Sequence, residues 1–308
     1  MPGLRNDIEF PTLDGTVLRG WFYPPAAPGK QPCIIMANGL AALKQQFLPS
    51  FAEGFQSAGY GVLLYDHRNW GSSEGTPRKE SDPAQQGRDY SDAFDYAASL
   101  PEVDDCRIIF WGSSMAGGAT IYASAFDHRI RATIVQVPFV SGEAQAGLLN
   151  KHLPDLYKNR QAIKAGSEHA TLQVFPRTSE GARSPDCPAL FKDPGMIPCL
   201  DYLNNHNLGW EGVVTVNTLL NIYGFEPAAF IHRIAPTPFL MVITDNDAEA
   251  STATQLRAYE LAREPKRLVI LRKAGHFDPY FGITFEKNMK HQLRFLRDVL
   301  QDDTGIEV

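Results

Sequence analysis

The sequence predicts an α/β fold, in which a mostly parallel β-sheet is covered by helices on both faces. Short, wholly apolar runs such as residues 33–37 are typical of strands that are buried on both faces. These runs alternate along the chain with segments of helical periodicity. The chain has 308 residues, of which 44% are hydrophobic, enough for a sizeable core. One α/β domain with an insertion fits this length.

The expected elements follow in chain order. An N-terminal hairpin pairs residues 7–12 with residues 16–23 around a turn signal at residues 13–15. The further strands are expected at residues 33–37, 60–65, 107–111, 132–137, 238–244 and 267–271. The helices are expected at residues 43–57, 88–100, 115–126, 252–262 and 285–300. The alternation of strands and helices breaks between the strand at residues 132–137 and the strand at residues 238–244. We therefore expect a core of residues 1–138 and 236–308 and a lid of residues 139–235.

The predicted lid contains scattered aromatic residues and a candidate amphipathic helix at residues 147–161. An insertion late in such a sheet lies over the carboxyl ends of the strands, where ligands bind. We therefore expect the lid to cover a pocket, with Trp210 and Tyr223 binding substrate. The alternative is a packed helical cap that does not contact substrate.

A serine between small residues follows the strand expected at residues 107–111. A sharp strand-to-helix turn that exposes a nucleophilic serine needs small residues two positions before and two positions after it. Ser114 meets this condition, with Gly112 and Ala116 at those positions, whereas Ser113 would be flanked by large side chains. The pattern predicts Ser114 as a nucleophile, and the alternative is a serine that merely caps the helix.

A serine hydroxyl needs a base within hydrogen-bond reach and a third group that orients the base. Of the eight histidines, His276 alone follows a late strand on a glycine-containing turn. Asp247 and Asp245 both follow the strand at residues 238–244, and of these two candidates we prefer Asp247.

Composition limits the other functions. The formal net charge is −6 and no basic cluster occurs, which argues against a nucleic-acid partner. No apolar run approaches the roughly 20 residues that span a bilayer, and the N-terminus lacks the apolar core of a signal peptide. The four cysteines lack metal-like spacing and are interpreted as reduced thiols of a cytoplasmic enzyme, with a Cys187–Cys199 pair as the alternative. No metal or organic cofactor is expected.

Further segments carry a resemblance to a known family. They are residues 66–75, 77–78, 82–83, 86, 88–90, 101–104, 136–138, 141–142 and 275–276. On these segments the chain resembles the α/β-hydrolase superfamily over nearly its whole length. Within it the chain is similar to fungal polyketide transferases and thiohydrolases, which share features with dienelactone-hydrolase-like and X-Pro-peptidase-like proteins. The family's acid lies three residues past a small residue, which Thr244 and Asp247 match.

One position departs from the family pattern. Many relatives have His-Gly after the first central strand, and this chain has Asn38-Gly39. The resemblance implies an oxyanion hole made by the backbone N–H groups of Leu40 and Met115, and backbone donors do not require the histidine. We therefore expect the oxyanion hole to be retained.

The loop at residues 66–75 has two interpretations. We expect a structural role, in which Asp66 and Arg68 hold the loop near the serine turn. The alternative is that the loop lines the pocket.

Together these residues predict acyl transfer from an ester or thioester through an acyl-enzyme on Ser114. The resemblance implies a polyketide-like acyl chain from secondary metabolism. The thioester is expected to be free or bound to a carrier protein, and a homodimer is a further expectation. The alternatives are a broad carboxylesterase or X-Pro-type peptidase, and a non-hydrolytic member that binds or cyclises a ligand.

Overall fold

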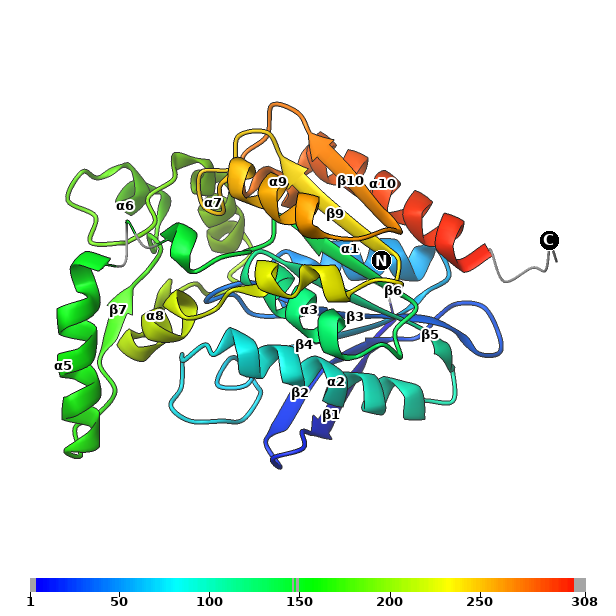
Figure 1. Cartoon of the computed structure of the whole chain (residues 1–308), viewed down its shortest axis with the longest axis horizontal. Helices are drawn as coiled ribbons and strands as arrows, with labels where there is room; N and C mark the ends of the chain where they lie inside the picture. The colour runs from blue at the N-terminus through cyan, green and yellow to red at the C-terminus, as the bar shows by residue number, and fades with distance from the viewer. Residues whose placement is uncertain (1–3, 146, 148–149, 302–308) are drawn as a thin grey trace.

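An eight-stranded sheet forms the centre of the molecule in the computed structural model, which describes residues 4–145, 147 and 150–301 (Figure 1). The strand order is β1-β2-β4-β3-β5-β6-β9-β10. Strand β2 runs antiparallel to both of its neighbours, and the pairs from β4 to β10 are all parallel. The strands are β1 (Asn6–Pro11), β2 (Val17–Tyr23), β3 (Gln31–Ala37), β4 (Gly61–Tyr65), β5 (Val103–Ser113), β6 (Ala132–Gln136), β9 (Phe239–Thr244) and β10 (Lys266–Leu271).

Helices cover both faces of the sheet, as predicted (Figure 1). Helices α1 (Leu48–Ser57) and α10 (Gly282–Gln301) pack on one face. Helices α2 (Pro83–Ser99), α3 (Met115–Phe126) and α9 (Thr252–Leu261) pack on the other. Alternate side chains of one strand serve the two faces: Ile34 and Met36 join the α1 and α10 core, while Ile35 joins the α2 and α3 core. This two-sided burial explains why the strands are apolar throughout.

The segment between β6 and β9 gathers at the end of the sheet where the parallel strands terminate (Figure 1). Its elements are η1 (Glu143–Gln145), η2 (Asn150–His152), α5 (Leu153–Lys164), β7 (Thr171–Gln173), α6 (Ser179–Arg183), η3 (Pro194–Met196), α7 (Ile197–Asn205), β8 (Val213–Thr215), α8 (Val216–Tyr223), η4 (Pro227–Ala229) and η5 (Ile231–Arg233). Strands β7 and β8 form a separate antiparallel pair. Apolar side chains of this insertion, including Val214 and Leu219, pack against Leu40 and Met115 of the core.

Three helix starts differ from the sequence prediction. Helix α10 begins at Gly282 rather than at residue 285, and the other two starts differ for a local reason. The helix expected from residue 43 begins at Leu48, because Phe47 has φ 66° and the residues before it form turns. The helix expected from residue 88 begins at Pro83, since the Asp82 carboxylate caps the N–H groups of the first turn and proline suits that position.

Within the insertion, the helix expected at residues 147–161 is observed as α5, preceded by η2, and residues 148–149 lie outside the described chain. The alternative of a Cys187–Cys199 disulfide is wrong, because both thiols are free and buried. Among the described residues, none of the helices combines the length and apolarity needed to cross a lipid bilayer.

Candidate active site

Ser114 lies at a sharp turn between β5 and α3, with φ 56° and ψ −123°. A non-glycine residue reaches this region only where the surrounding structure imposes it. The close approach of strand and helix explains Gly112, since a Cβ there would lie 2.2 Å from Thr120 Oγ1 and 2.3 Å from the Ala116 carbonyl oxygen. The Ser114 side chain makes no capping hydrogen bond to the helix. The hydroxyl is therefore free for the partner described next.

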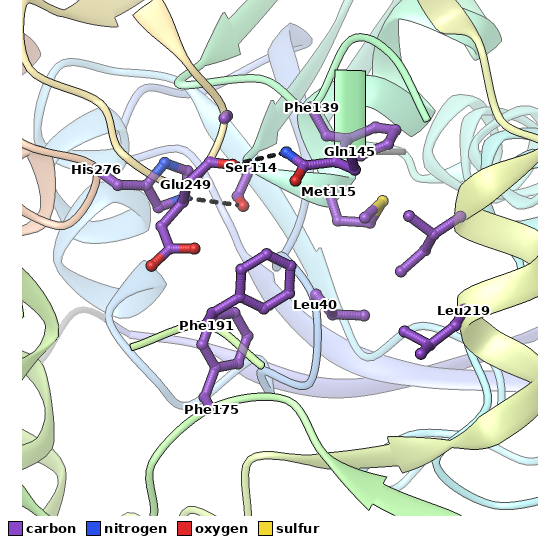
Figure 2. Close-up of a pocket in the computed structure, with 12 residues that line it drawn as sticks. Leu40, Ser114, Met115, Phe139, Gln145, Phe175, Phe191, Leu219, Glu249 and His276 are labelled. Atoms are coloured by element: carbon purple, nitrogen blue, oxygen red, sulfur yellow. Dashed lines mark hydrogen bonds between the residues drawn. The ribbon is translucent and has the colours of Figure 1, made fainter. Parts of the chain in front are cut away.

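Ser114, His276 and Asp247 form one chain of hydrogen bonds (Figure 2 shows the serine and the histidine). The Ser114 Oγ lies 3.0 Å from His276 Nε2. On the other side of the ring, His276 Nδ1 lies 2.9 Å and 3.0 Å from the two Asp247 carboxylate oxygens. The three residues follow β5, β10 and β9, whose carboxyl ends meet at one edge of the sheet.

Asp247 is held as an anion by four donors. The N–H groups of Glu249 and Ala250 donate to Oδ1, at 3.0 Å and 2.8 Å. The Gln255 amide donates to Oδ2 at 2.9 Å, and His276 occupies the remaining direction. Burial alone would raise the pKa of Asp247, but His276 and these donors outweigh it and lower the pKa.

The pKa of His276 moves in the opposite direction. The ring is buried, and burial disfavours the imidazolium. The attraction of the Asp247 carboxylate is stronger, and it raises the pKa of His276 above the ordinary histidine value. A carboxylate that stabilises the imidazolium makes this histidine a better proton acceptor for the Ser114 hydroxyl.

The two alternative residues lie elsewhere. Asp245 is exposed, and its carboxylate accepts the N–H of Ala274 at 3.1 Å, which helps to shape the loop that carries His276. Ser113 is fully buried, with its Oγ 2.6 Å from the Tyr280 hydroxyl and 3.0 Å from the Gln136 amide nitrogen. Neither hydrogen-bonds to the imidazole in the described structure.

The backbone at Gly39 and Leu40 comes close to the serine. A Cβ on Gly39 would lie 3.0 Å from Ser114 Cβ and 3.4 Å from its Oγ, so any larger residue there would crowd the nucleophile. Leu40 and Met115 line the cavity beside Ser114 (Figure 2). Within the described part of the chain, neither of their N–H groups donates to another protein group. Two unpaired donors beside a nucleophile are the arrangement that stabilises an oxyanion.

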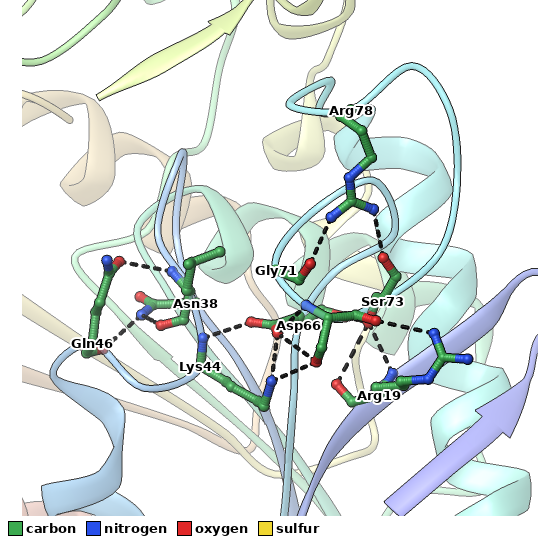
Figure 3. A network of polar contacts seen from close by, with 10 residues as sticks. Arg19, Asn38, Lys44, Gln46, Asp66, Gly71, Ser73 and Arg78 are labelled. Atoms are coloured by element: carbon green, nitrogen blue, oxygen red, sulfur yellow. Dashed lines mark hydrogen bonds and ion pairs between the residues drawn. The ribbon is translucent and has the colours of Figure 1, made fainter. Parts of the chain in front are cut away.

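Asn38 organises the loop that carries the N–H group of Leu40 (Figure 3). Its side-chain N–H₂ donates to the Leu43 carbonyl at 2.9 Å and to the Gln46 carbonyl at 2.7 Å. Its side-chain oxygen accepts the Gly39 N–H at 2.9 Å. The asparagine, where the resemblance led us to expect histidine, thus ties both ends of the loop to one buried side chain. These bonds also use carbonyls that a helix beginning at residue 43 would require.

The loop at residues 66–75 is tied to the same region (Figure 3). The buried Asp66 carboxylate binds the Lys44 Nζ at 2.6 Å and the Lys44 N–H at 2.7 Å, and it accepts the Ser72 N–H at 3.0 Å. Arg68 binds both carboxylate oxygens of Asp89 on α2. Asp66 and Arg68 therefore anchor the loop, and in addition Trp70 lines an outer groove shared with the insertion.

The cavity beside Ser114 is mostly apolar. Its lining consists of Leu40, Ser114, Met115, Phe139, Gln145, Phe175, Phe191, Leu219, Ile222, Glu249, Ala250 and His276. The free space within it is about 40 Å³, room for only a few water molecules. Trp210 lines a second cavity on the other side of Ser114, together with Phe277 and Tyr280, and also the outer groove. Tyr223 packs in the cluster between insertion and core, outside the lining of both cavities.

Sequence reasoning missed several residues that surround the site. Gln255 and Glu249 carry no pattern that distinguishes them from other polar residues of the segment after β9. Phe175 and Phe191 belong to the aromatic residues of the insertion, but only the structure selects them as lining residues.

Comparisons with known proteins show the family to which the chain belongs. The model of the alpha/beta hydrolase family matches residues 34–282, most of the chain. The chain belongs to the alpha/beta hydrolase family. Polyketide transferase grgF of Penicillium sp is 33% identical over 95% of this chain and 96% of its own length. Thiohydrolase aneE of Aspergillus aculeatus is 31% identical over 96% of this chain and 93% of its own.

The same likeness holds in three dimensions. The crystal structure of the alpha/beta hydrolase GrgF from Penicillium sp. sh18 superposes with a TM-score of 0.85 at 31% identity, over 97% of this chain and 99% of that one. This alpha/beta hydrolase thus resembles relatives named polyketide transferase and thiohydrolase in sequence over nearly its full length, and it shares its fold with GrgF.

Proposed function

We propose that this alpha/beta hydrolase transfers an acyl group from an ester or thioester to water or a second nucleophile, through an acyl-enzyme on Ser114. The observation that carries the proposal is the hydrogen-bond chain from Ser114 Oγ through His276 to Asp247. It supplies a nucleophile, a base and an orienting carboxylate at hydrogen-bond distances.

Each step has a group to perform it. His276 Nε2 accepts the hydroxyl proton as the Ser114 oxygen attacks the carbonyl carbon, and Asp247 stabilises the imidazolium that forms. The N–H groups of Leu40 and Met115 stabilise the oxyanion. The imidazolium then returns the proton to the leaving alcohol or thiol, and the acyl group stays on the serine oxygen. Water or a second nucleophile reverses these steps and releases the acyl product.

The cavity lining supports an acyl chain of the polyketide type. Apolar side chains from the core and the insertion surround the space beside Ser114, which suits a largely hydrocarbon group. The names of the relatives, polyketide transferase and thiohydrolase, point to the same substrate class. Because the free space is about 40 Å³, a long chain requires residues 139–235 to move away from the core as a lid.

Three narrower points are part of the proposal. The thioester is free or carrier-bound, Trp210 contacts substrate from the second cavity, and the enzyme acts in the cytoplasm, which four free cysteines support. Tyr223 would bind substrate only after the lid has moved. Homodimer formation is tested by the mass of the native protein in solution.

Intact-protein mass spectrometry tests the central claim. The wild-type protein and Ser114→Ala are mixed with a short acyl thioester, and the mass and the released thiol are followed. We expect a gain of one acyl group on the wild type and none on Ser114→Ala, while Ser113→Ala still gains it. Added alcohols, amines or a carrier protein then distinguish transfer from hydrolysis. If several thioesters and esters give neither adduct nor thiol, the acyl-enzyme is refuted and a ligand-binding role takes its place.

A further inference from the structure

Glu249 is an acidic side chain that lines a mostly apolar cavity. It lies two residues after Asp247, and its carboxyl group points into the space between His276 and Phe191 (Figure 2). Besides His276, it is the one ionisable side chain among the described residues that line this cavity. The proposed acyl transfer does not use it, since Asp247 already orients the imidazole.

The carboxyl group of Glu249 has few partners in the protein. The backbone N–H of Asp193 donates to it. Gln145 lies beside it but donates at 2.8 Å to the Glu249 backbone carbonyl, not to the carboxylate. No Lys or Arg forms an ion pair with it in the described part of the chain. Glu249 is partly buried, and removing even part of a carboxyl group from water with so few partners costs free energy.

Three ionisable groups face Glu249 from three different segments of the chain. His276 faces it from the loop after β10, Asp193 from the insertion and Asp247 from its own loop. Burial, reinforced by the two aspartates, raises the pKa of Glu249 to about 7. Near neutral pH the group is therefore present both as a carboxylic acid and as a carboxylate, and both forms accept a hydrogen bond.

We propose that Glu249 binds a hydroxyl group of the acyl chain that occupies the apolar cavity. The inference rests on the proposed function, because it concerns the substrate of that same site. A hydroxyl fits better than an amine, since a cationic amine would lie beside the imidazolium that His276 forms during the reaction. The site would then select hydroxylated acyl chains over fully reduced ones, because a reduced chain offers the carboxyl group no hydrogen-bond donor.

The first experiment measures binding without turnover. Ser114→Ala is titrated calorimetrically with methyl octanoate and with methyl octanoates that carry a hydroxyl on the third, fifth or seventh carbon. We expect at least one hydroxylated ester to bind about tenfold or more tightly than methyl octanoate, the size of a hydrogen bond to an ionised group. The preference should grow when the pH is raised from about 6 to about 8, because the carboxylate is the stronger acceptor.

Variants in the same Ser114→Ala protein identify the group responsible. Glu249→Leu should remove the preference while methyl octanoate still binds, and Glu249→Gln should keep part of it, since the amide oxygen still accepts. Equal affinity for all four esters, no binding of any, or a preference that survives Glu249→Leu overturns the proposal. If Glu249→Leu fails to bind methyl octanoate, the Glu249→Gln variant and the comparison of the four esters in the Ser114→Ala protein decide whether the proposal holds. Acyl-enzyme formation by the wild type tests the proposed function separately.

Discussion

Asn38→Ala should lower both the stability and the activity of this protein. The substitution removes three hydrogen bonds of the buried Asn38 side chain, those to the Leu43 and Gln46 carbonyls and that from the Gly39 N–H. At about 1 kcal/mol for each bond, the loss of unfolding free energy is about 3 kcal/mol. With an unfolding entropy of about 2 cal/mol/K per residue over 308 residues, this corresponds to a Tm lowered by roughly 5 °C.

The effect on rate follows from the loop that Asn38 holds. Gly39 is packed against Ser114 and the next N–H group is the proposed oxyanion donor of Leu40, so a loosened loop misplaces that donor. Losing one such donor costs about 100-fold in kcat. Steady-state hydrolysis of a p-nitrophenyl ester well below the Tm measures the rate, and calorimetry measures the stability.

A matched control separates the two effects. Thr133→Val removes one buried hydrogen bond, from Thr133 Oγ1 to Ser124 Oγ at 2.9 Å, between β6 and α3 and away from the oxyanion loop. It should lower the Tm and leave kcat nearly unchanged. The reasoning would be refuted by a folded Asn38→Ala protein with wild-type kcat, or by an equal loss of kcat in Thr133→Val.

Three further predictions concern the base, the close approach at the nucleophile and the buried ion pair. Activity should fall as the pH drops through the raised pKa of His276, since the base must be neutral. Asp247→Asn should move this acidic limb of the pH–rate profile to lower pH and reduce kcat by roughly 10⁴-fold. An acidic limb that does not move would argue against His276 as the base and Asp247 as its partner. Gly39→Ala should reduce kcat, because the new methyl group 3.0 Å from the nucleophile's Cβ forces Ser114 to shift by a few tenths of an ångström, and a fully active variant would contradict this geometry. Lys44→Met should cost about 3 to 5 kcal/mol in chemical denaturation, because it leaves the Asp66 carboxylate buried without its cation, and a loss below about 1 kcal/mol would show that the pair is solvated.

Helix boundaries show where sequence reasoning ends. The apolar periodicity identified α1 and α2, but not where they begin. The start of α1 depends on Phe47 and on bonds from the distant Asn38 side chain. The start of α2 was readable in principle, since Asp82 followed by proline is a helix-start signal. These helix starts were predicted wrongly because capping interactions determine where a helix begins, and apolar periodicity does not record them.

The sequence by itself determined the features that depend on neighbouring residues. Short, wholly apolar runs alternate with segments of helical periodicity, and this alternation predicted the mostly parallel sheet. A strand buried on both faces is apolar throughout, whereas a helix that covers the sheet is apolar on one side only. The choice of Ser114 over Ser113 needed only the sizes of residues two positions away, since strand and helix collide at those positions if the side chains are large.

Only the tertiary structure decided which side chains from separate loops meet. Asp245 and Asp247 follow the same strand, but Asp247 hydrogen-bonds to the His276 ring while Asp245 is exposed to solvent. Glu249 looks like any acidic residue of a loop until the insertion and the core enclose it. Asn38 looked like a departure from the family pattern until its three bonds were seen. The physical reason is that strand order in the sheet brings these loops to one edge, and a short stretch of sequence does not record that order.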